Sequence, residues 1–457
     1  MTYPDVFVDL YQWAYLKSYA SIILKELGRK NPDEFLMRGY AQLLRNNPDY
    51  ARLWFAQVIS LLGDWFDTIT LLTLVAVYSP EQYKGIAVSG LMLARFIPPM
   101  IISPFGGVLI DRLDRKKLMI WSNWLRALVV LGLVLTTRGP QFLWLIYALS
   151  IVQFSLSAIF EPAQSAITPA LVHSDDLLQA NTLGNITWSA MLAFGAAIGG
   201  VVSAVVGANV ALLIDSLSFV IAALLIAPIK AYEFKALETK SHEPKNDTSF
   251  HEGLRFLRRN PATASTLLIK FGASLGSVDT LMTIFATQVF LLGSNGQLSL
   301  GIQYSAFGIG AIIGPPLLNR FNDGSVSAMR RLVIIGFLFA VMGWFIMGNA
   351  WSLAVLCLAL IFRAMGGSAN WTYSTVMIQK LVPDSYLGRV FSLDMAFYYL
   401  ANVVSTLAHG SLVDALGAAN IRLIALGTMV VSLIPLIVWT VLTRRFERQP
   451  AAPVPQT

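Results

Sequence analysis

The chain has 457 residues, of which 56% are apolar and only 13% are charged, and its mean hydropathy is +0.62. This balance lies outside that of soluble globular domains and indicates a membrane protein. The net charge of +7 does not indicate a nucleic-acid partner, because lysine and arginine gather in alternate connections between apolar runs, as positive-inside asymmetry requires.

Residues 1–51 precede the first apolar run and predict a cytoplasmic or interfacial helical extension. The segment "DVFVDLYQWAYLKSYASIILKEL" is apolar with several aromatic residues, which suits a helix lying on the cytoplasmic membrane face. The segment "NPDEFLMRGYAQLLR" predicts a second helix, with Asn31 as its N-cap and Pro32 at its first position. Alternatively, the extension binds a partner or a second copy of the chain. No basic segment precedes an apolar one, so we expect no cleavable signal peptide.

Twelve apolar runs follow, each long enough to cross a hydrocarbon core about 30 Å thick as a helix. The expected spans are 53–78, 84–110, 117–137, 140–166, 180–206, 209–229, 263–292, 298–320, 329–349, 351–378, 387–413 and 418–443. Their continuous apolar character excludes a membrane β-barrel, whose strands alternate. The predicted fold class is an all-α membrane protein with twelve transmembrane helices.

An internal repeat divides these spans into six and six. The stretch "LRNNPDYARLWFAQVISLLGDW" and the stretch "LRRNPATASTLLIKFGASLGSV", 213 positions later, share an Asn-Pro and a Leu-Gly at the same spacing. We expect Asn47 and Asn260 to cap the helices that follow them. The predicted domains are bundles at 52–229 and 263–443, joined by a cytoplasmic linker at 230–262 and followed by a tail at 444–457. Transporters with two parallel repeats bind substrate near the membrane midplane.

Charged residues inside the spans are the strongest candidates for transport chemistry, since each costs about 2.5–3.5 kcal/mol at a helix centre unless paired, protonated or facing water. Asp64 and Asp67 share one face of the first span because they are three residues apart. The expected proton-coupling or transport residues are Asp64, Asp67, Asp279, Arg95, Arg126 and Arg363. Which acid pairs with which arginine stays open, and hydrogen bonding without proton exchange is the alternative role.

Four further charged residues in the spans are expected to have simpler roles. Glu161, Asp215 and Asp394 suit helix ends or hydrogen bonds between helices. Lys270 is expected to extend its flexible side chain to the cytoplasmic membrane face rather than to contact an anionic substrate.

The motif "GGVLIDRLDRKK" ends the second span and resembles the loop 2–3 signature of the major facilitator superfamily. Its glycines permit close helix approach, and its charges suit a latch that breaks when the two halves rock. The expected switch residues are Gly106, Gly107, Asp111, Arg112, Arg115 and Lys116. Plain positive-inside charge is the alternative explanation.

The fifth span contains "FGAAIGG", which resembles the antiporter signature of exporting members, with Ala196 where that signature has proline. Gly195, Gly199 and Gly200 are the matching residues. A small-residue face for close helix packing explains the same pattern.

Over residues 52–443 the segments "WLRALVVLGLVL", "FEPAQSAITPALVHSDDLLQANTL" and "GRVFSLDMAF" look like the branch that holds macrolide-efflux proteins and the enterobactin exporter. The resemblance implies a proton-coupled exporter of amphipathic drugs or siderophores that works by alternating access. The implied partners are a small-molecule substrate, protons and membrane lipids. We expect a monomer in the plasma membrane with both termini in the cytoplasm, as the positions of lysine and arginine also indicate.

Several absences limit the function further. The chain has no GxxxxGK[ST] or HExxH motif and only one cysteine, Cys357, so we expect no cofactor, no metal site and no enzymatic activity. An importer or lipid carrier on the same fold is one alternative. A non-transporting scaffold or sensor that acts through the N-terminal helices is the alternative from another class.

Overall fold

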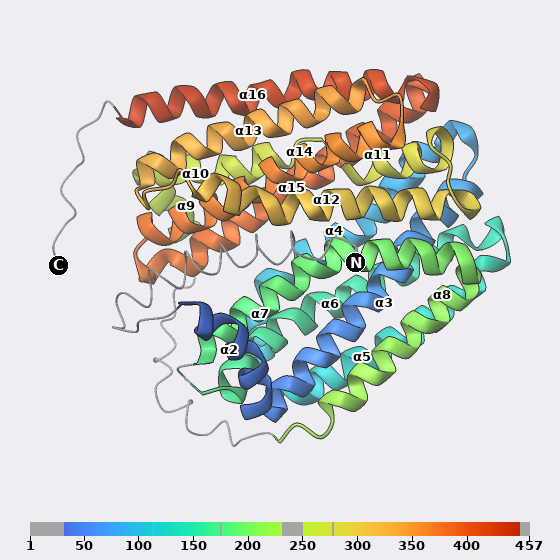
Figure 1. The fold of residues 1–457 in the computed structure, drawn as a ribbon, viewed down its shortest axis with the longest axis horizontal. Coiled ribbons are helices and arrows are strands. Elements are labelled where there is room, and N and C mark those ends of the chain that lie inside the picture. Colours follow the sequence, from blue (N-terminus) through green and yellow to red (C-terminus); the bar gives the residue numbers. More distant parts are fainter. Residues whose placement is uncertain (1–31, 113, 174–175, 231–249, 277, 448–457) are drawn as a thin grey trace. The chain divides into compact units, whose positions relative to one another are not determined.

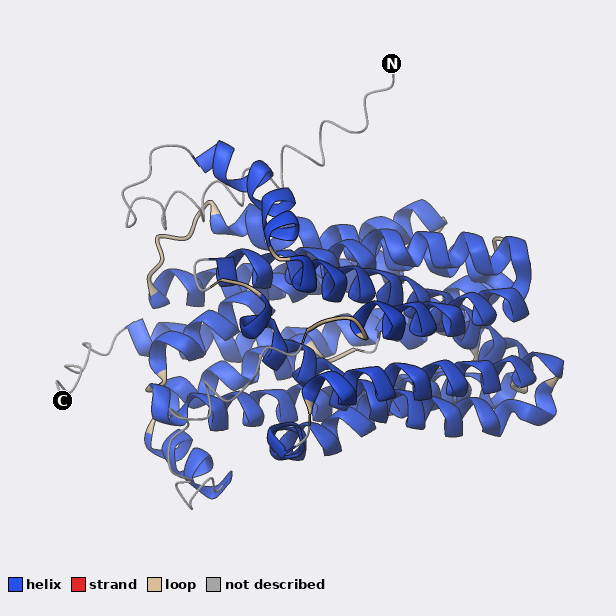
Figure 2. Cartoon of the chain, turned by 90° about the horizontal axis from the view of Figure 1, so that it is seen from below, coloured by secondary structure: helices blue, strands red, loops and turns tan. Residues whose placement is uncertain are grey.

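The computed structural model of the chain describes residues 32–112, 114–173, 176–230, 250–276 and 278–447. Within these residues the chain folds into helices and forms no strand (Figures 1 and 2). The all-α prediction is therefore confirmed. The predicted interfacial helix before residue 32, and with it Asn31, lies outside the described residues, whereas the second predicted helix begins at Pro32 as expected.

Most helices follow the predicted apolar runs, with ends that differ by a few residues, but the predicted run 263–292 contains two helices and the predicted runs 180–206 and 209–229 join. Their bounds are α2 (Pro32–Asn46), α3 (Pro48–Tyr78), α4 (Lys84–Arg112), α5 (Arg115–Leu133), α6 (Leu143–Leu171), α7 (Leu177–Ala190), α8 (Ala196–Ile226), α9 (Phe250–Arg259), α10 (Pro261–Ala273), α11 (Val278–Ile284), α12 (Gln297–Asn319), α13 (Val326–Gly348), α14 (Leu353–Leu381), α15 (Asp384–Leu416) and α16 (Ile421–Glu447).

The described residues contain eleven helices long and apolar enough to cross a membrane, rather than the predicted twelve. The difference arises in a helical stretch of 48 residues, Gln179–Ile226, where one crossing needs about 20 residues. Inside this stretch Gly207 has a φ of 80° and a ψ of 166°, which no helix contains. The predicted fifth and sixth spans thus meet at Gly207 without a loop, and twelve crossings stays a prediction.

The repeated Asn-Pro pairs have the same structure in both places. Asn47 Nδ2 donates a hydrogen bond to the Leu43 carbonyl at 3.0 Å, and Asn260 Nδ2 donates to the Phe256 carbonyl at 2.9 Å. Asn260 is the N-cap residue of α10, as predicted, but its side chain makes no capping bond to that helix. Because α9 and α10 join without a loop, the side-chain amide instead satisfies a carbonyl at the end of the preceding helix.

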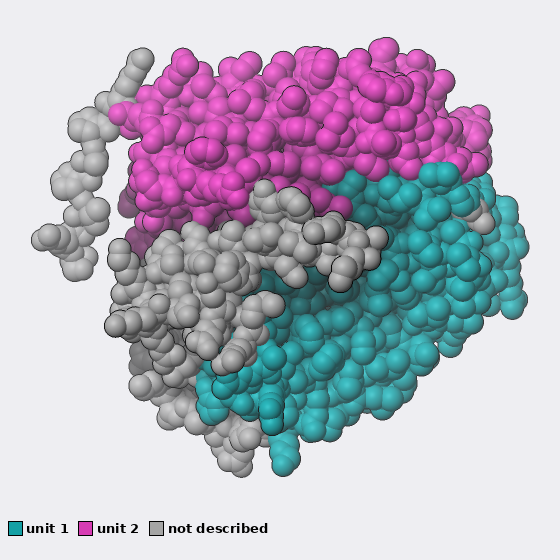
Figure 3. All heavy atoms as spheres, in the orientation of Figure 1, with its two compact units in different colours: residues 1–78, 101–241, 292–308 teal, residues 79–100, 242–291, 309–457 magenta. Residues whose placement is uncertain are grey.

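The chain forms two compact units, coloured separately in Figure 3. Unit 1 comprises residues 1–78, 101–241 and 292–308, and unit 2 comprises residues 79–100, 242–291 and 309–457. Each of α4 and α12 is therefore shared, with its first part in one unit and its remainder in the other. The predicted halves at 52–229 and 263–443 describe the sequence repeat and remain a prediction.

Each unit has its own apolar core. In unit 1, buried Leu43 of α2 packs with Tyr50, Met119, Phe160 and Ile226. In unit 2, α10, α13, α14 and α16 contribute buried residues to one cluster, among them Ile269, Val333, Phe337, Tyr373 and Trp439. The packing of α2 shows that this part of the predicted extension belongs to the body of unit 1.

Candidate functional site

The candidate site of unit 1 is built around Arg126, which is buried on α5. Its Nη2 donates to both carboxylate oxygens of Asp64 on α3, at 2.9 Å and 3.3 Å. The guanidinium carbon also lies 4.0 Å from the centroid of the Phe219 ring on α8, a distance suited to a cation–π interaction. Of the three candidate arginines, Arg126 is therefore the partner of Asp64.

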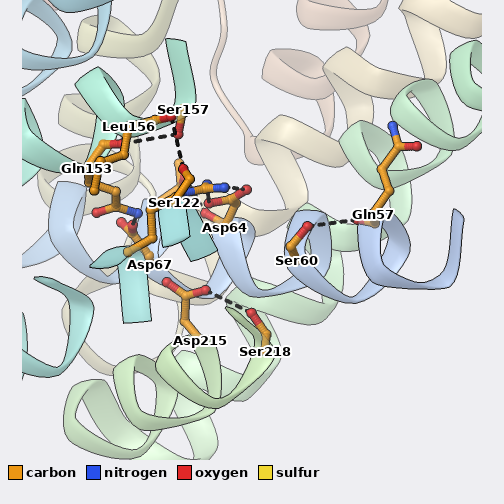
Figure 4. A network of polar contacts seen from close by, with 12 residues as sticks. Gln57, Ser60, Asp64, Asp67, Ser122, Gln153, Leu156, Ser157, Asp215 and Ser218 are labelled. Atoms are coloured by element: carbon orange, nitrogen blue, oxygen red, sulfur yellow. Dashed lines mark hydrogen bonds and ion pairs between the residues drawn. The ribbon is translucent and has the colours of Figure 1, made fainter. Parts of the chain in front are cut away.

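Asp67 lies one helical turn beyond Asp64 and is more deeply buried. Its Oδ2 accepts a hydrogen bond of 2.6 Å from Gln153 Nε2 on α6 (Figure 4). Asp67 is 1% exposed, whereas the Asp64 side chain is 30% exposed. The two aspartates thus lie on one helix face, as predicted, but in different surroundings.

Asp215 on α8 also belongs to this site, although the sequence indicated only a structural role for it. It is fully buried, accepts a hydrogen bond of 3.3 Å from Ser218 and lies close enough to Asp64, Asp67 and Arg126 for their charges to act on it. Figure 4 shows Asp215 and Ser218 beside the helix that carries Asp67. We call Asp64, Asp67, Arg126, Gln153 and Asp215 the Arg126 cluster.

Helix α3 approaches α8 closely at this cluster because position 63 is glycine. A Cβ atom at Gly63 would collide with the Ser218 hydroxyl and with the Asp215 carboxylate. Glu161 on α6 contributes a further carboxylate, which is exposed but lies within range of the charges of Arg126 and Asp64. The charge of Arg126 therefore acts on Asp64, Asp215 and Glu161, and Asp67 lies within range of Asp215.

Unit 2 holds a second buried ion pair, between Lys270 on α10 and Asp394 on α15. Lys270 Nζ lies 2.5 Å from Asp394 Oδ2, and their side chains are 1% and 0% exposed. The ammonium group also lies 4.3 Å from the centroid of the Trp371 ring on α14. The prediction that Lys270 reaches the membrane face is wrong, because an interior carboxylate and an aromatic ring stabilise its charge instead.

The other predicted charges of the spans also lie in unit 2. Arg363 Nη2 donates to the Ala273 carbonyl at 2.6 Å, and the charge of Asp279 on α11 acts on Arg363. Arg95 is half-buried on the first part of α4. The six candidates thus fall into two groups, with Asp64, Asp67 and Arg126 in unit 1 and Asp279, Arg95 and Arg363 in unit 2.

The loop motif after the second span is described only in part. Helix α4 continues through Gly106, Gly107, Asp111 and Arg112, whose side chains lie outside the described residues. Arg115 Nη1 donates to the Ala166 carbonyl on α6 at 3.0 Å, and Lys116 is half-buried. Asp114 caps α5 by accepting from the Lys117 amide. The latch that these residues are expected to form stays a prediction.

The glycines of the antiporter-like motif lie against other helices of unit 1. A Cβ atom at Gly195 would lie 2.6 Å from the Trp65 ring, and one at Gly199 would lie 2.8 Å from the Trp65 carbonyl oxygen. A Cβ atom at Gly200 would lie 2.9 Å from the Gly301 Cα on α12. The glycines therefore permit close packing, and their part in antiport stays a prediction.

Comparison with known proteins gives one matching family and many relatives. The family described as transmembrane secretion effector, MFS_3, matches residues 40–454. The match begins within α2, upstream of residue 52, where the predicted first bundle begins. Macrolide efflux protein A of Streptococcus pyogenes is 26% identical over 399 residues, covering 83% of this chain and 92% of that protein. The enterobactin exporter EntS of Shigella boydii is 26% identical over 420 residues, covering 89% of this chain and 95% of that protein.

The fold is also that of solved transporters. The crystal structure of the nucleoside transporter NupG matches with a TM-score of 0.66 at 10% sequence identity. The match covers 86% of this chain and 98% of that one. At this identity the likeness concerns the arrangement of helices and carries no information on the ligand.

Proposed function

We propose that this chain, which belongs to the transmembrane secretion effector family of the major facilitator superfamily, couples proton entry to the export of an amphipathic small molecule. The chain is a multi-pass membrane transporter and not an enzyme. In this proposal it acts as a monomer in the plasma membrane, contacts membrane lipids and has both termini in the cytoplasm, as the lysine and arginine positions favour.

The observation that carries the proposal is the fully buried carboxylate of Asp215, on which the charges of Asp67 and Asp64 act as well as that of Arg126. The Arg126 guanidinium already pairs with Asp64. A buried carboxylate beside other carboxylates is expensive inside a membrane, and binding a proton removes its charge. A proton that enters down a membrane potential contributes about 2.3 kcal/mol per 100 mV.

The elements that carry the cluster are suited to respond to protonation. Asp64 and Asp67 lie on α3, their partners Arg126 and Gln153 lie on α5 and α6, and Asp215 lies on α8. Loss of a carboxylate charge changes the contacts of α3 with three other helices of unit 1. This supports alternating access as the means by which proton binding favours one conformation over another.

Relatives support an amphipathic cargo. Two proteins similar to this chain over most of their length are named for the efflux of macrolides and of enterobactin. Both compound classes combine apolar surface with polar groups, which suits a site lined by aromatic and a few polar residues. We therefore propose macrolides and catechol siderophores as the first ligands to test.

The test uses purified chain in proteoliposomes with an imposed pH gradient, screened against a macrolide and a catechol siderophore. We expect gradient-driven accumulation and substrate-dependent proton movement. Asp67→Asn and Asp215→Asn should abolish the response to the pH gradient yet retain substrate exchange without a gradient, because exchange needs no net proton transfer. Asp323→Asn, in an exposed loop, is the matched control and should behave as the unaltered chain.

Two results would contradict the proposal. Full gradient-driven transport by both cluster variants would remove these carboxylates from proton coupling. Substrate uptake by the unaltered chain that ignores the pH gradient and moves no protons would remove proton coupling altogether.

A further inference from the structure

The helix that repeats α3 in the second half of the chain is interrupted. Helix α10 ends at Ala273 and α11 begins at Val278, whereas α3 continues through the corresponding position without a break. Gly276, which is 213 positions after Gly63, has a φ of +98°, a conformation that favours glycine. Its amide donates a hydrogen bond of 2.5 Å to Ser405 Oγ on α15. The interruption is therefore a built feature of unit 2.

Two further side chains hold Gly276 in place. A Cβ atom at this glycine would lie 2.5 Å from Trp344 Cζ2 on α13 and 2.7 Å from Thr428 Cγ2 on α16. Thr428 is 213 positions after Asp215, so the two repeats place Asp215 against Gly63 and Thr428 against Gly276. The buried carboxylate of the first repeat is thus replaced by a hydroxyl in the second.

The titratable group at this place in unit 2 is His409 on α15, which is 6% exposed. Its Nδ1 lies 2.8 Å from the Ser405 carbonyl oxygen, and its Nε2 lies 2.8 Å from Thr428 Oγ1. Its ring stacks on Trp344 with centroids 6.3 Å apart and an interplanar angle of 22°. The three residues that contact Gly276 are therefore the same three that contact His409.

The hydrogen bonds of His409 accommodate both of its charge states. A carbonyl oxygen only accepts, so Nδ1 carries a proton in either state. Thr428 Oγ1 also lies 2.8 Å from the Ile424 carbonyl. In the neutral ring the Thr428 hydroxyl donates to Nε2, and in the imidazolium Nε2 donates to Thr428 while the hydroxyl donates to Ile424. A proton can bind without movement of any heavy atom.

Charged groups on the surrounding elements have partners in unit 2. Arg363 on α14 lies 5.4 Å from the Trp344 ring centroid and donates to the Ala273 carbonyl, at the end of α10. Other charged groups on these elements also have contacts. Asp279 on α11 acts on Arg363, and Lys270 on α10 pairs with Asp394 on α15. Asp414 on α15 accepts from the Gly85 and Ile86 amides, Arg422 on α16 donates to the Ala350 carbonyl, and Arg330 on α13 lies over the Phe446 ring.

We infer that His409 is a second proton-binding site of this transporter, and that its protonation is coupled to the interruption between α10 and α11. The coupling runs through Ser405 and Thr428, each of which contacts both His409 and Gly276. A protonated ring also brings a second cation to Trp344, beside Arg363. The role of this site in transport rests on the proposed function, whereas proton binding by His409 does not.

Proton binding is tested directly by a nuclear magnetic resonance titration of the full chain in lipid nanodiscs, with ¹³C at the Cε1 atoms of its four histidines. His409→Gln identifies the His409 signal by its loss, and His173→Gln, at an exposed position, is the matched control. We expect the His409 signal to shift as the pH is lowered through the range in which the chain stays folded, because histidine can take up a proton there. A constant His409 signal over this range would overturn the inference.

Coupling to the interruption is tested by amide hydrogen exchange of the segment around Gly276, corrected for the intrinsic effect of pH. In the unaltered chain, the protection factor of these amides should change with pH across the titration of His409. The change should be about tenfold for each unit by which the pKa of His409 differs between the closed and the open state of the segment. His409→Gln should remove this change and His173→Gln should retain it. Equal pH dependence in His409→Gln and the unaltered chain would refute the coupling.

A transport readout separates this inference from the proposed function. The pH profile of substrate exchange should flatten in His409→Gln, while gradient-driven transport should fail in Asp67→Asn. A titrating His409 in a chain that moves no protons would support the proton site and contradict the proposed function. An unchanged exchange profile in His409→Gln would support proton coupling elsewhere and contradict a transport role for His409.

Discussion

At the scale of single residues, several charged side chains of the membrane spans have partners far away in the sequence. Asp64 pairs with Arg126, Asp67 with Gln153, and Lys270 with Asp394. The sequence identifies such residues because charge in an apolar run is costly. It does not identify the pairs, since those depend on how neighbouring helices are rotated about their axes.

Gly63 provides a test of the close approach between α3 and α8. In Gly63→Ala the added methyl group would collide with Ser218 and Asp215, so we expect a loss of about 1–3 kcal/mol in stability, typical of overpacking. Gly184→Ala is the matched control, because a Cβ at Gly184 meets no atom within 4 Å. It should be neutral or stabilising by up to about 1 kcal/mol. Thermal unfolding in one detergent would compare them, and equal melting temperatures would contradict the predicted contact.

The same residue-scale reasoning explains why Asp215 was missed. Its position near the start of an apolar run suggested a helix end, where a carboxylate is readily solvated. The structure instead gives it full burial, a contact with Gly63 and the charges of Asp64, Asp67 and Arg126. The sequence nevertheless contained a signal for Asp215. The repeat places Gly63 and Gly276 at matching positions, and at the same spacing of 213 residues Asp215 matches Thr428.

At the scale of helices, apolar runs predicted where elements occur but not where they break. Hydropathy is continuous across residues 274–277, so the sequence predicted one span where the structure has α10 and α11. Continuity also suggested a short connection between the fifth and sixth spans, where Gly207 alone changes the chain direction. Both breaks depend on backbone dihedral angles at glycine, which hydropathy does not report.

Gly207 can be tested separately from packing, because a Cβ there would meet no atom within 4 Å. Its φ of 80° favours glycine, so Gly207→Ala should destabilise the chain by about 1–2 kcal/mol through backbone strain alone. Gly427→Ala, at a position on α16 that also has open space, should be neutral or slightly stabilising. Thermal unfolding compares the two variants. A Gly207→Ala chain as stable as Gly427→Ala or more stable would contradict the break at residue 207 and indicate a continuous helix.

At the scale of the whole molecule, composition, loop motifs and the internal repeat predicted the family, and the match over residues 40–454 confirms it. These signals are patterns along the sequence, so they can be recognised without a structure. The distribution of α4 and α12 over two compact units was not predicted, because it depends on which helices pack together. The cargo stays a proposal for a related reason, since ligand contacts are made by few side chains.

A substitution in helix α2 tests whether this part of the N-terminal extension stabilises unit 1. Leu43 is 2% exposed in the core of unit 1, so Leu43→Ala should cost about 2–5 kcal/mol, as expected for a truncated core leucine. Gln42→Ala, at the exposed neighbouring position, should change stability by less than about 0.5 kcal/mol. Unfolding of the purified chain measures both. An unaffected Leu43→Ala chain would favour the scaffold alternative, in which α2 serves only a partner.

The Lys270–Asp394 pair has a consequence for the order in which the protein is made. Its partners are 124 residues apart, and at about 5–20 residues per second Asp394 is synthesised roughly 6–25 s after Lys270. During this interval the lysine has no native counter-ion. Asp64 and Arg126 are only 62 residues apart, so the corresponding interval for that pair is half as long. A chain whose synthesis stops before α15 therefore keeps a lysine without its native counter-ion in the seventh span, where an unpaired charge is costly.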